Sequence, residues 1–399
     1  MTHGSETRAD RRPMAGLRVL DLTSNVAGPL AGQVMADLGA EVIKVEPPEG
    51  EAGRRIRSTI PGQEELMPYF LPHHRGKKSV VVDLRTSEGV ETLRTLTATA
   101  DVFMQGFRPG YLDRLGLGAD ALRTVNPRLI YASLSAYSGT GTQRQRPGID
   151  ALIQSEAGLL TGLVGEEGRP LLPAPTFVDA SSGHALAQGV LAALLARERF
   201  GHGDTVDVAL YDVAISLQAP FVTRQLNTAP EHAHLTADGR GSVAVTPSGA
   251  FRAKDGYLML FAYVPKHWAL LVEALDRADL ATDPRFIDQF HRTRHRGELT
   301  EELEASLGQR TVAEWSRLLT SLGVMASPPL TWADVVTSDA FREAELAIAV
   351  DSDHGEQTAV RMPVRYASFT PGGGGHVPAV GEHTEQVLGT LPLRAGSAS

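Results

Sequence analysis

Short apolar runs alternate with predicted helical segments at the start of the chain. Arg18–Leu22 and Glu41–Val45 have the length and composition of buried strands, and Pro29–Leu38 between them is predicted to be a helix. Gly39 follows in the position where glycine commonly ends a helix. The pattern predicts a strand–helix–strand unit with parallel strands and a right-handed crossover.

The same alternation continues further along the chain. The predicted strands are Ser79–Leu84, Asp101–Met104, Leu129–Leu134 and Thr205–Leu210, and the predicted helices are Ser87–Thr97, Ala119–Val125 and one starting at Tyr211. Strands that alternate with helices are typical of an α/β fold with a mostly parallel sheet. Such sheets bind ligands beyond the carboxyl ends of their strands, so the loops there are candidate sites.

These loops carry cations but no dinucleotide-binding fingerprint. No G-x-G-x-x-G follows the first strand, which disfavours a nicotinamide site of the usual kind. The cations in or near the loops are Arg54, Arg55, Arg57, Arg75, Lys77, Lys78, Arg108 and Arg114. They could bind a phosphorylated ligand or form a solvated face, and composition alone favours neither interpretation.

Asp179 lies between a short apolar run and a predicted helix. The apolar run Thr176–Val178 ends in Asp179, small residues follow, and an Ala/Leu-rich helix continues to Phe200. An Asp at such a junction can be a helix N-cap, because its carboxylate accepts hydrogen bonds from the first-turn N–H groups. On this pattern alone the cap is the favoured interpretation, and the alternative is a nucleophile whose small neighbours let a substrate come close.

A polar segment, residues 226–247, divides the second half of the chain and is predicted to be a linker. Beyond it, Gly249–Arg252 and Tyr257–Ala262 flank a hairpin turn, and helices are predicted at Lys266–Leu275, Glu298–Leu307 and Val312–Leu322. The predicted organisation is a disordered tail (1–15), a large domain (16–225), the linker, a smaller domain (248–330) and a return to the large domain (331–399). In that return, Met362–Tyr366 is predicted as a strand and Gly372–Gly375 as a flexible surface loop.

Composition narrows the function classes. The 399 residues are 42% hydrophobic, without the apolar stretch of about 18 residues that a membrane span needs, and the polar N-terminus does not resemble a secretion signal, so we expect a cytoplasmic protein. The net charge of −9 disfavours nucleic acid as a partner. The absence of cysteine leaves covalent chemistry to Asp, Glu, Ser, Lys or His. No His/Asp/Glu trio has metal-ligand spacing, so no metal is expected.

The loops, taken in order, resemble the class III CoA-transferase family (the CaiB/BaiF type) from Gly16 to Leu393. The motifs are V-L-D-L-T…V-A-G-P at 19–29, L-G-A-E-V-I-K-V-E-P-P at 38–48, R-G-K-K-S-V-V-V-D-L at 75–84, F-R-P-G…L-D-R-L-G-L at 107–117, N-P-R-L-I-Y-A-S-L-S-A-Y at 126–137, G-H-G-D-T-V-D-V-A-L-Y-D at 201–212 and V-G-E-H-T-E-Q-V-L at 380–388. The resemblance implies a large Rossmann-like domain with a parallel sheet and a smaller α/β domain, in an interlocked homodimer.

The resemblance also implies a reaction. Asp179 would attack an acyl-CoA thioester and pass through an aspartyl anhydride and an aspartyl-CoA thioester, before CoA moves to a free carboxylic acid. The N–H groups and dipole of the following helix would keep its carboxylate ionised. Coenzyme A would be a substrate rather than a permanently bound cofactor. The implied CoA-binding residues are Val26, Ala27, Arg75, Lys77, Phe107, Arg114, Leu115 and Tyr137.

Departures from the family's pattern bear on specificity. Formyl-CoA transferase members carry His, Gln and Lys where this chain has Ser24, Val26 and Ser135, so we expect a more apolar acyl pocket. An α-methylacyl-CoA racemase is the alternative function. Racemases of this fold resemble G-H-D where this chain has Gly148-Ile149-Asp150, and an isoleucine cannot transfer a proton. Asp150 is expected to start a helix and to support the site.

Overall fold

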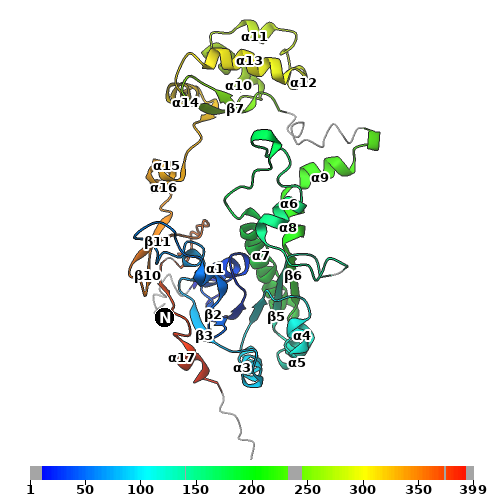
Figure 1. The fold of residues 1–399 in the computed structure, drawn as a ribbon, viewed down its shortest axis with the longest axis vertical. Helices are drawn as coiled ribbons and strands as arrows, with labels where there is room; N and C mark the ends of the chain where they lie inside the picture. The colour runs from blue at the N-terminus through cyan, green and yellow to red at the C-terminus, as the bar shows by residue number, and fades with distance from the viewer. Residues whose placement is uncertain (1–10, 140, 232–244, 373, 392–399) are drawn as a thin grey trace, which may run out of the picture. The chain divides into compact units, whose positions relative to one another are not determined.

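The computed structural model describes residues 11–139, 141–231, 245–372 and 374–391 (Figure 1). The chain divides into two compact units. The larger comprises residues 1–223 and 345–399, and the smaller comprises residues 224–344. The return to the larger domain was predicted at residue 331, whereas residues 331–344 group with the smaller unit. Residues 11–15 were predicted to belong to a disordered tail, whereas the Met14 side chain is buried in the core.

A parallel sheet organises the larger unit. Its strands are β1 (Arg18–Leu22), β2 (Glu41–Glu46), β3 (Lys78–Val81), β4 (Val102–Gln105), β5 (Ile130–Ser135) and β6 (Thr205–Ala209). They lie in the order β3-β2-β1-β4-β5-β6, and every neighbouring pair is parallel. This confirms the predicted α/β fold with a Rossmann-like sheet, because the chain winds outward first from β1 and then from β4.

The larger unit also contains helices, most of which connect these strands. They are α1 (Ala27–Asp37), α2 (Leu71–His74), α3 (Ser87–Thr97), α4 (Tyr111–Arg114), α5 (Ala119–Val125), α6 (Asp150–Glu156), α7 (Phe177–Phe200), α8 (Leu210–Leu217), α9 (Ala219–Leu226) and α17 (Thr384–Leu388), with the 3-10 turns η2 (Ala52–Arg55) and η3 (Glu166–Gly168). None of the helices in the described residues combines the length and apolar character needed to cross a membrane.

Successive residues of the central strand β1 enter two different cores. Val19 packs with Met35 of α1 and Val190 of α7, whereas Leu20 packs with Phe103 of β4 and Leu93 of α3. Because side chains alternate between the two faces of a strand, this division places helices on both faces of the sheet. Burial on both faces also explains why these strands are continuous apolar runs in the sequence.

The C-terminal return forms a small sheet, but not where it was predicted. Its strands are β10 (Ala347–Ser352), β11 (Gln357–Val360) and β12 (His376–Val377), in the order β11-β10-β12. The predicted strand Met362–Tyr366 is wrong, since this segment is irregular and its Pro363 has no N–H to donate to a neighbouring strand. The predicted loop at Gly372–Gly375 includes Gly373, which lies outside the described residues.

The smaller unit has its own antiparallel sheet and its own core. The strands are β7 (Ser248–Arg252), β8 (Tyr257–Phe261) and β9 (Met325–Ser327), and the helices are α10 (Pro265–Ala274), α11 (Asp279–Thr282), α12 (Gln289–Arg294), α13 (Arg296–Leu307), α14 (Val312–Ser321), α15 (Trp332–Thr337) and α16 (Asp339–Glu343). The β7–β8 hairpin confirms the prediction, and β9 pairs with the other side of β8. Leu258 and Leu260 of β8 pack with Trp268, Leu303 and Trp315 of the helices.

Candidate active site

A cavity of about 150 Å³ lies at the carboxyl edge of the parallel sheet. It is lined by Thr23, Ser24, Asn25, Val26, Ala27, Gly106, Leu134, Ser135, Ala136, Gly148, Ile149, Asp179 and Leu210. The loops after β1 and β4 both contribute, and the winding of the sheet reverses between these two strands. Open α/β sheets bind their ligands at such a switch point, so the location is the one expected for a functional site.

Two close backbone approaches bring the parts of this cavity together. A Cβ atom on Gly183 of α7 would lie 2.5 Å from the Ala27 carbonyl oxygen, so α7 crosses the start of α1 at a distance that only glycine permits. A Cβ atom on Gly28 would lie 2.2 Å from the Thr23 Cβ. The tight fold of the β1–α1 loop therefore depends on glycine at this position. Small residues therefore place Val26 and Ala27 beside the helix that carries Asp179.

Asp179 is the third residue of α7, because the helix begins at Phe177. Of the two interpretations offered for Asp179, the one as the helix N-cap is therefore wrong. Thr176 occupies the N-cap and makes no hydrogen bond from its side chain to the helix. Instead, the N–H of Asp179 donates to Oδ2 of Asp150 over 2.9 Å. Asp150 begins α6, as predicted, and its side chain is buried.

The electrostatic surroundings of Asp179 favour the protonated form of its carboxyl group. Burial and, to a smaller extent, the negative charge of Asp150 raise the pKa of Asp179 to about 6. This direction is opposite to the effect expected from the helix N-terminus alone. A carboxylate with this pKa is still mostly ionised at neutral pH, and it is a stronger base than an exposed aspartate.

The structure brings some of the predicted CoA-binding residues to the cavity. Val26 and Ala27 line it and are buried. Tyr137 lies in the same small core as Leu210, which lines the cavity, and as Val178, which precedes Asp179. The Tyr137 hydroxyl donates to Oε2 of Glu156 over 2.7 Å, which fixes the ring next to the site.

The predicted nucleotide-binding residues of the loop after β4 lie around α4. The Phe107 ring stacks on Tyr111 with 5.0 Å between centroids, and the Arg114 guanidinium lies 5.9 Å from the Tyr111 ring. Arg114 is exposed and Leu115 is half-buried. This loop thus presents aromatic surface and a cation, which are groups suited to an adenine ring and a phosphate.

Arg75 and Lys77 are arranged differently. Both side chains are buried, with Arg75 Nη2 lying 2.6 Å from Oδ2 of Asp37 and Lys77 Nζ lying 2.8 Å from Oδ2 of Asp21. Lys44 Nζ lies 3.7 Å from the same Asp21 carboxylate, whose pKa falls to about 2 because these neighbouring ammonium groups outweigh the effect of burial. Arg75 and Lys77 therefore balance internal charge in this chain, which does not support the predicted contact of either side chain with CoA.

Leu210 was not identified from the sequence as a site residue. It begins α8 directly after β6, and its side chain reaches the cavity beside Ser135 of the neighbouring strand β5. The sequence did place Leu210 at the end of a predicted strand. It did not show that this strand, β6, lies beside β5, whose following loop was already a candidate site. That proximity depends on the order of the strands in the sheet.

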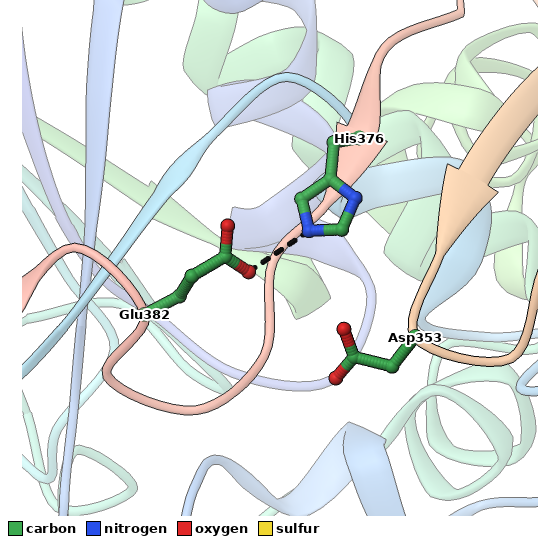
Figure 2. Close-up of side chains that lie close together, drawn as sticks. All are labelled: Asp353, His376 and Glu382. Atoms are coloured by element: carbon green, nitrogen blue, oxygen red, sulfur yellow. Dashed lines mark hydrogen bonds and ion pairs between the residues drawn. The ribbon is translucent and has the colours of Figure 1, made fainter.

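Among the residues that the structure describes, one trio of side chains could supply metal ligands, although none was expected from sequence spacing. Asp353, His376 and Glu382 each offer one ligand atom within 4.8 Å of the others (Figure 2). His376 Nε2 lies 2.8 Å from Oε2 of Glu382, and the same oxygen accepts from the N–H of Ala379. The trio is partly or fully exposed, so its contacts are those of a surface ion pair as much as of a cation site.

Comparison with known proteins identifies the family. A sequence model of "CoA-transferase family III" matches residues 14–384. The chain is 49% identical over 384 residues to the "Probable fatty acyl-CoA transferase Rv3272" of Mycobacterium tuberculosis, covering 94% of this chain and 98% of that protein. It is 31% identical over 384 residues to the mouse "Succinyl-CoA:glutarate CoA-transferase", covering 94% of this chain and 86% of the relative.

Solved structures agree with this assignment. The orthorhombic crystal structure of Rv3272 matches with a TM-score of 0.85 at 48% identity, covering 93% of this chain and 98% of that one. A CaiB/BaiF family protein from Brucella suis matches with a TM-score of 0.80 at 32% identity, covering 95% of this chain and 99% of that one. The fold and the cavity define an α/β protein with its site at the switch point of a parallel sheet. Within that class, the chain belongs to CoA-transferase family III and is a CoA-transferase.

Proposed function

We propose that this enzyme moves CoA from an acyl-CoA donor to a free carboxylic acid through covalent intermediates on Asp179. The observation that carries the proposal is the placement of Asp179, a half-buried carboxylate with a raised pKa, in the cavity at the switch point of the sheet. Val26 and Ala27 lie beside it and would contact the thioester end of the substrate. Phe107, Arg114, Leu115 and Tyr137 would contact the remainder of CoA.

The reaction proceeds through exchanges at acyl carbons. A carboxylate oxygen of Asp179 attacks the thioester carbon, the C–S bond breaks, and CoA leaves as the thiolate, which gives a mixed anhydride. The thiolate then attacks the aspartyl carbonyl carbon and releases the donor acid, leaving an aspartyl-CoA thioester. The acceptor carboxylate attacks that thioester, and the returning thiolate takes the acceptor's acyl group and restores Asp179.

The walls of the cavity favour an apolar acyl group. Val26, Ala136, Ile149 and Leu210 supply aliphatic carbon around Asp179. A small dianionic acid such as oxalate would bring a second carboxylate against these side chains without a cation to pair with it. We therefore propose medium-chain or aromatic acids as the preferred substrates.

Ile149 also bears on the alternative function, an α-methylacyl-CoA racemase. Its side chain lines the same cavity as Asp179. A two-base racemisation needs a second group at the α-carbon that can take or give a proton, and an aliphatic side chain has none. The composition of the cavity therefore favours transfer over racemisation.

Intact-protein mass spectrometry after incubation with acyl-CoA donors tests the proposal. We expect wild type to gain the mass of CoA or of an acyl group, and Asp179→Ala to gain neither. Octanoyl-CoA and benzoyl-CoA should label the enzyme more completely than oxalyl-CoA. Exchange of the α-proton in deuterated water without any adduct would instead support the racemase.

A further inference from the structure

The first turn of α7 is capped by a side chain from a different helix. The N–H of Asp179 is one of the donors that a helix leaves without an internal partner, and Oδ2 of Asp150 on α6 accepts from it over 2.9 Å. The other carboxylate oxygen, Oδ1, accepts from Nε2 of Gln154, one turn further along α6. Asp150 is 6% exposed and Gln154 is 1% exposed, so this network is shielded from water.

This arrangement affects what the Asp179 carboxylate can do. The N–H of the third residue of a helix is ordinarily bonded by the N-cap side chain. Here the N-cap Thr176 makes no such bond, and Asp150 accepts from the N–H of Asp179 in its place. Within the described residues, no side-chain hydrogen bond or ion pair holds the Asp179 carboxylate, so its oxygens are available to a substrate in the cavity.

The charge of Asp150 is the main fixed charge near the nucleophile. α7 packs against α1, α6, α8, β5 and β6. β5 carries no acidic or basic side chain, and α1 carries none before Asp37 at its far end. Asp207 of β6 and Asp212 of α8 are exposed. Glu156 of α6 is paired with Arg146. Asp150 is thus the buried, unneutralised carboxylate that faces Asp179.

We propose that Asp150 is a positioning residue for the transfer reaction, which caps α7 from α6 so that the Asp179 carboxylate stays free and directed at the substrate. The proposal rests on the proposed role of Asp179 as nucleophile. Asp150 has two separable effects, one from the hydrogen bond that it accepts and one from its charge. The hydrogen bond sets the geometry of Asp179, and the charge, together with burial, raises the pKa of Asp179 to about 6.

Two substitutions separate these effects. Asp150→Asn keeps an oxygen that can accept from the N–H of Asp179, because the Gln154 amide can turn over to accept from the new NH₂ group. Asp150→Ala removes both the acceptor and the charge. Glu88→Gln is the matched control, since Glu88 is an exposed acid in the first turn of α3 and lies outside the site.

The readouts are kcat and KM for an octanoyl-CoA donor, measured from pH 4.5 to 8.5. Wild type and Glu88→Gln should lose activity as the pH falls through about 6. Asp150→Asn should retain kcat within about tenfold at pH 8, and the acid limb of its profile should move to lower pH. Asp150→Ala should lose about 100-fold in kcat with little change in KM, because the nucleophile is misplaced while CoA still binds.

Two outcomes would overturn the inference while leaving the proposed function intact. One is an Asp150→Asn enzyme whose activity falls at the same acid pH as that of wild type. The other is an Asp150→Ala enzyme with the kcat of wild type. Circular dichroism distinguishes a misplaced nucleophile from an unfolded protein, and the pH profile of Asp150→Asn decides the question should Asp150→Ala fail to fold. A wild-type enzyme with no adduct and no transfer for any donor would instead refute the proposed function itself.

Discussion

The side chain of Asp179 illustrates how a functional residue can lower the stability of its own fold. Its pKa rises from 3.8 in an unfolded chain to about 6 in the folded protein. The folded state therefore binds more protons than the unfolded state between about pH 4 and pH 6, and stability falls as the pH rises through that window. Above the window, the full cost of holding the charged carboxylate in the cavity is present.

We predict that Asp179→Asn stabilises the protein at pH 8 by about 1–3 kcal/mol and that this gain shrinks toward zero at pH 4. Urea denaturation of both proteins at the two pH values measures the effect. Asp212→Asn, at an exposed position in the first turn of α8, should change the unfolding free energy by less than about 0.5 kcal/mol. An equal gain for Asp179→Asn at both pH values would contradict the argument.

Single residues were predictable where their type and motif defined a role. Asp179 could be selected because a carboxylate precedes small residues at the start of a helix, inside a recognisable set of loops. The alternative interpretation of Asp179 as the N-cap was wrong because the N-cap is Thr176, three residues earlier in the chain. Arg75 and Lys77 show the other limit, since a buried cation paired with Asp37 or Asp21 has the same sequence signature as a free one.

At the scale of helices and strands, the crossing of α1 and α7 determines the geometry of the site. Gly183→Ala would place a Cβ atom against the Ala27 carbonyl oxygen, which is backbone and cannot rotate away. We predict a loss of about 1–3 kcal/mol in stability, despite the higher helix propensity of alanine, and a lower transfer rate because Val26 and Ala27 move away from Asp179. Urea denaturation and initial rates of transfer measure the two effects.

Gly297→Ala is the control for helix propensity alone, because nothing lies within 4 Å of the position that its Cβ atom would occupy on α13. It should leave transfer unchanged and alter stability by no more than about 1 kcal/mol. A Gly183→Ala enzyme with wild-type rate and stability would show that the two helices can separate without cost.

The strands were predictable because burial on both faces leaves a continuous apolar run, and helices are predictable where burial on one face leaves a periodic apolar pattern. β1, β2, β4 and β5 follow that rule, and all were located within a residue or two. Met362–Tyr366 was mistaken for a strand because a short apolar run has the same pattern whether or not a partner strand lies beside it. The partner is a property of the tertiary fold, and here the pairing goes to β10, β11 and β12 instead.

For the whole molecule, the sequence predicted two compact units but misplaced their boundary. Residues 332–343 form α15 and α16, which belong to the smaller unit although no change in composition marks its end. The resemblance also predicts an interlocked homodimer, which we retain as a proposal. Large apolar side chains are exposed in both units, among them Ile149, Phe177 and Trp332, and this exposure supports the dimer.

Soluble monomers rarely expose large contiguous apolar patches, and such patches commonly mark interfaces. Leu226 is 80% exposed and Trp332 is 74% exposed, which favours cover by a second copy of this chain. We predict a mass close to twice 42.7 kDa by light scattering coupled to size-exclusion chromatography, unchanged by dilution to nanomolar concentration. Trp332→Ser should weaken the dimer. Phe290→Ser removes another exposed aromatic side chain, and comparing the two variants tests whether the loss of any exposed aromatic side chain weakens the dimer equally. A mass of one chain at all concentrations would exclude the dimer, and the enzyme would then have to carry out the transfer with the residues of a single chain.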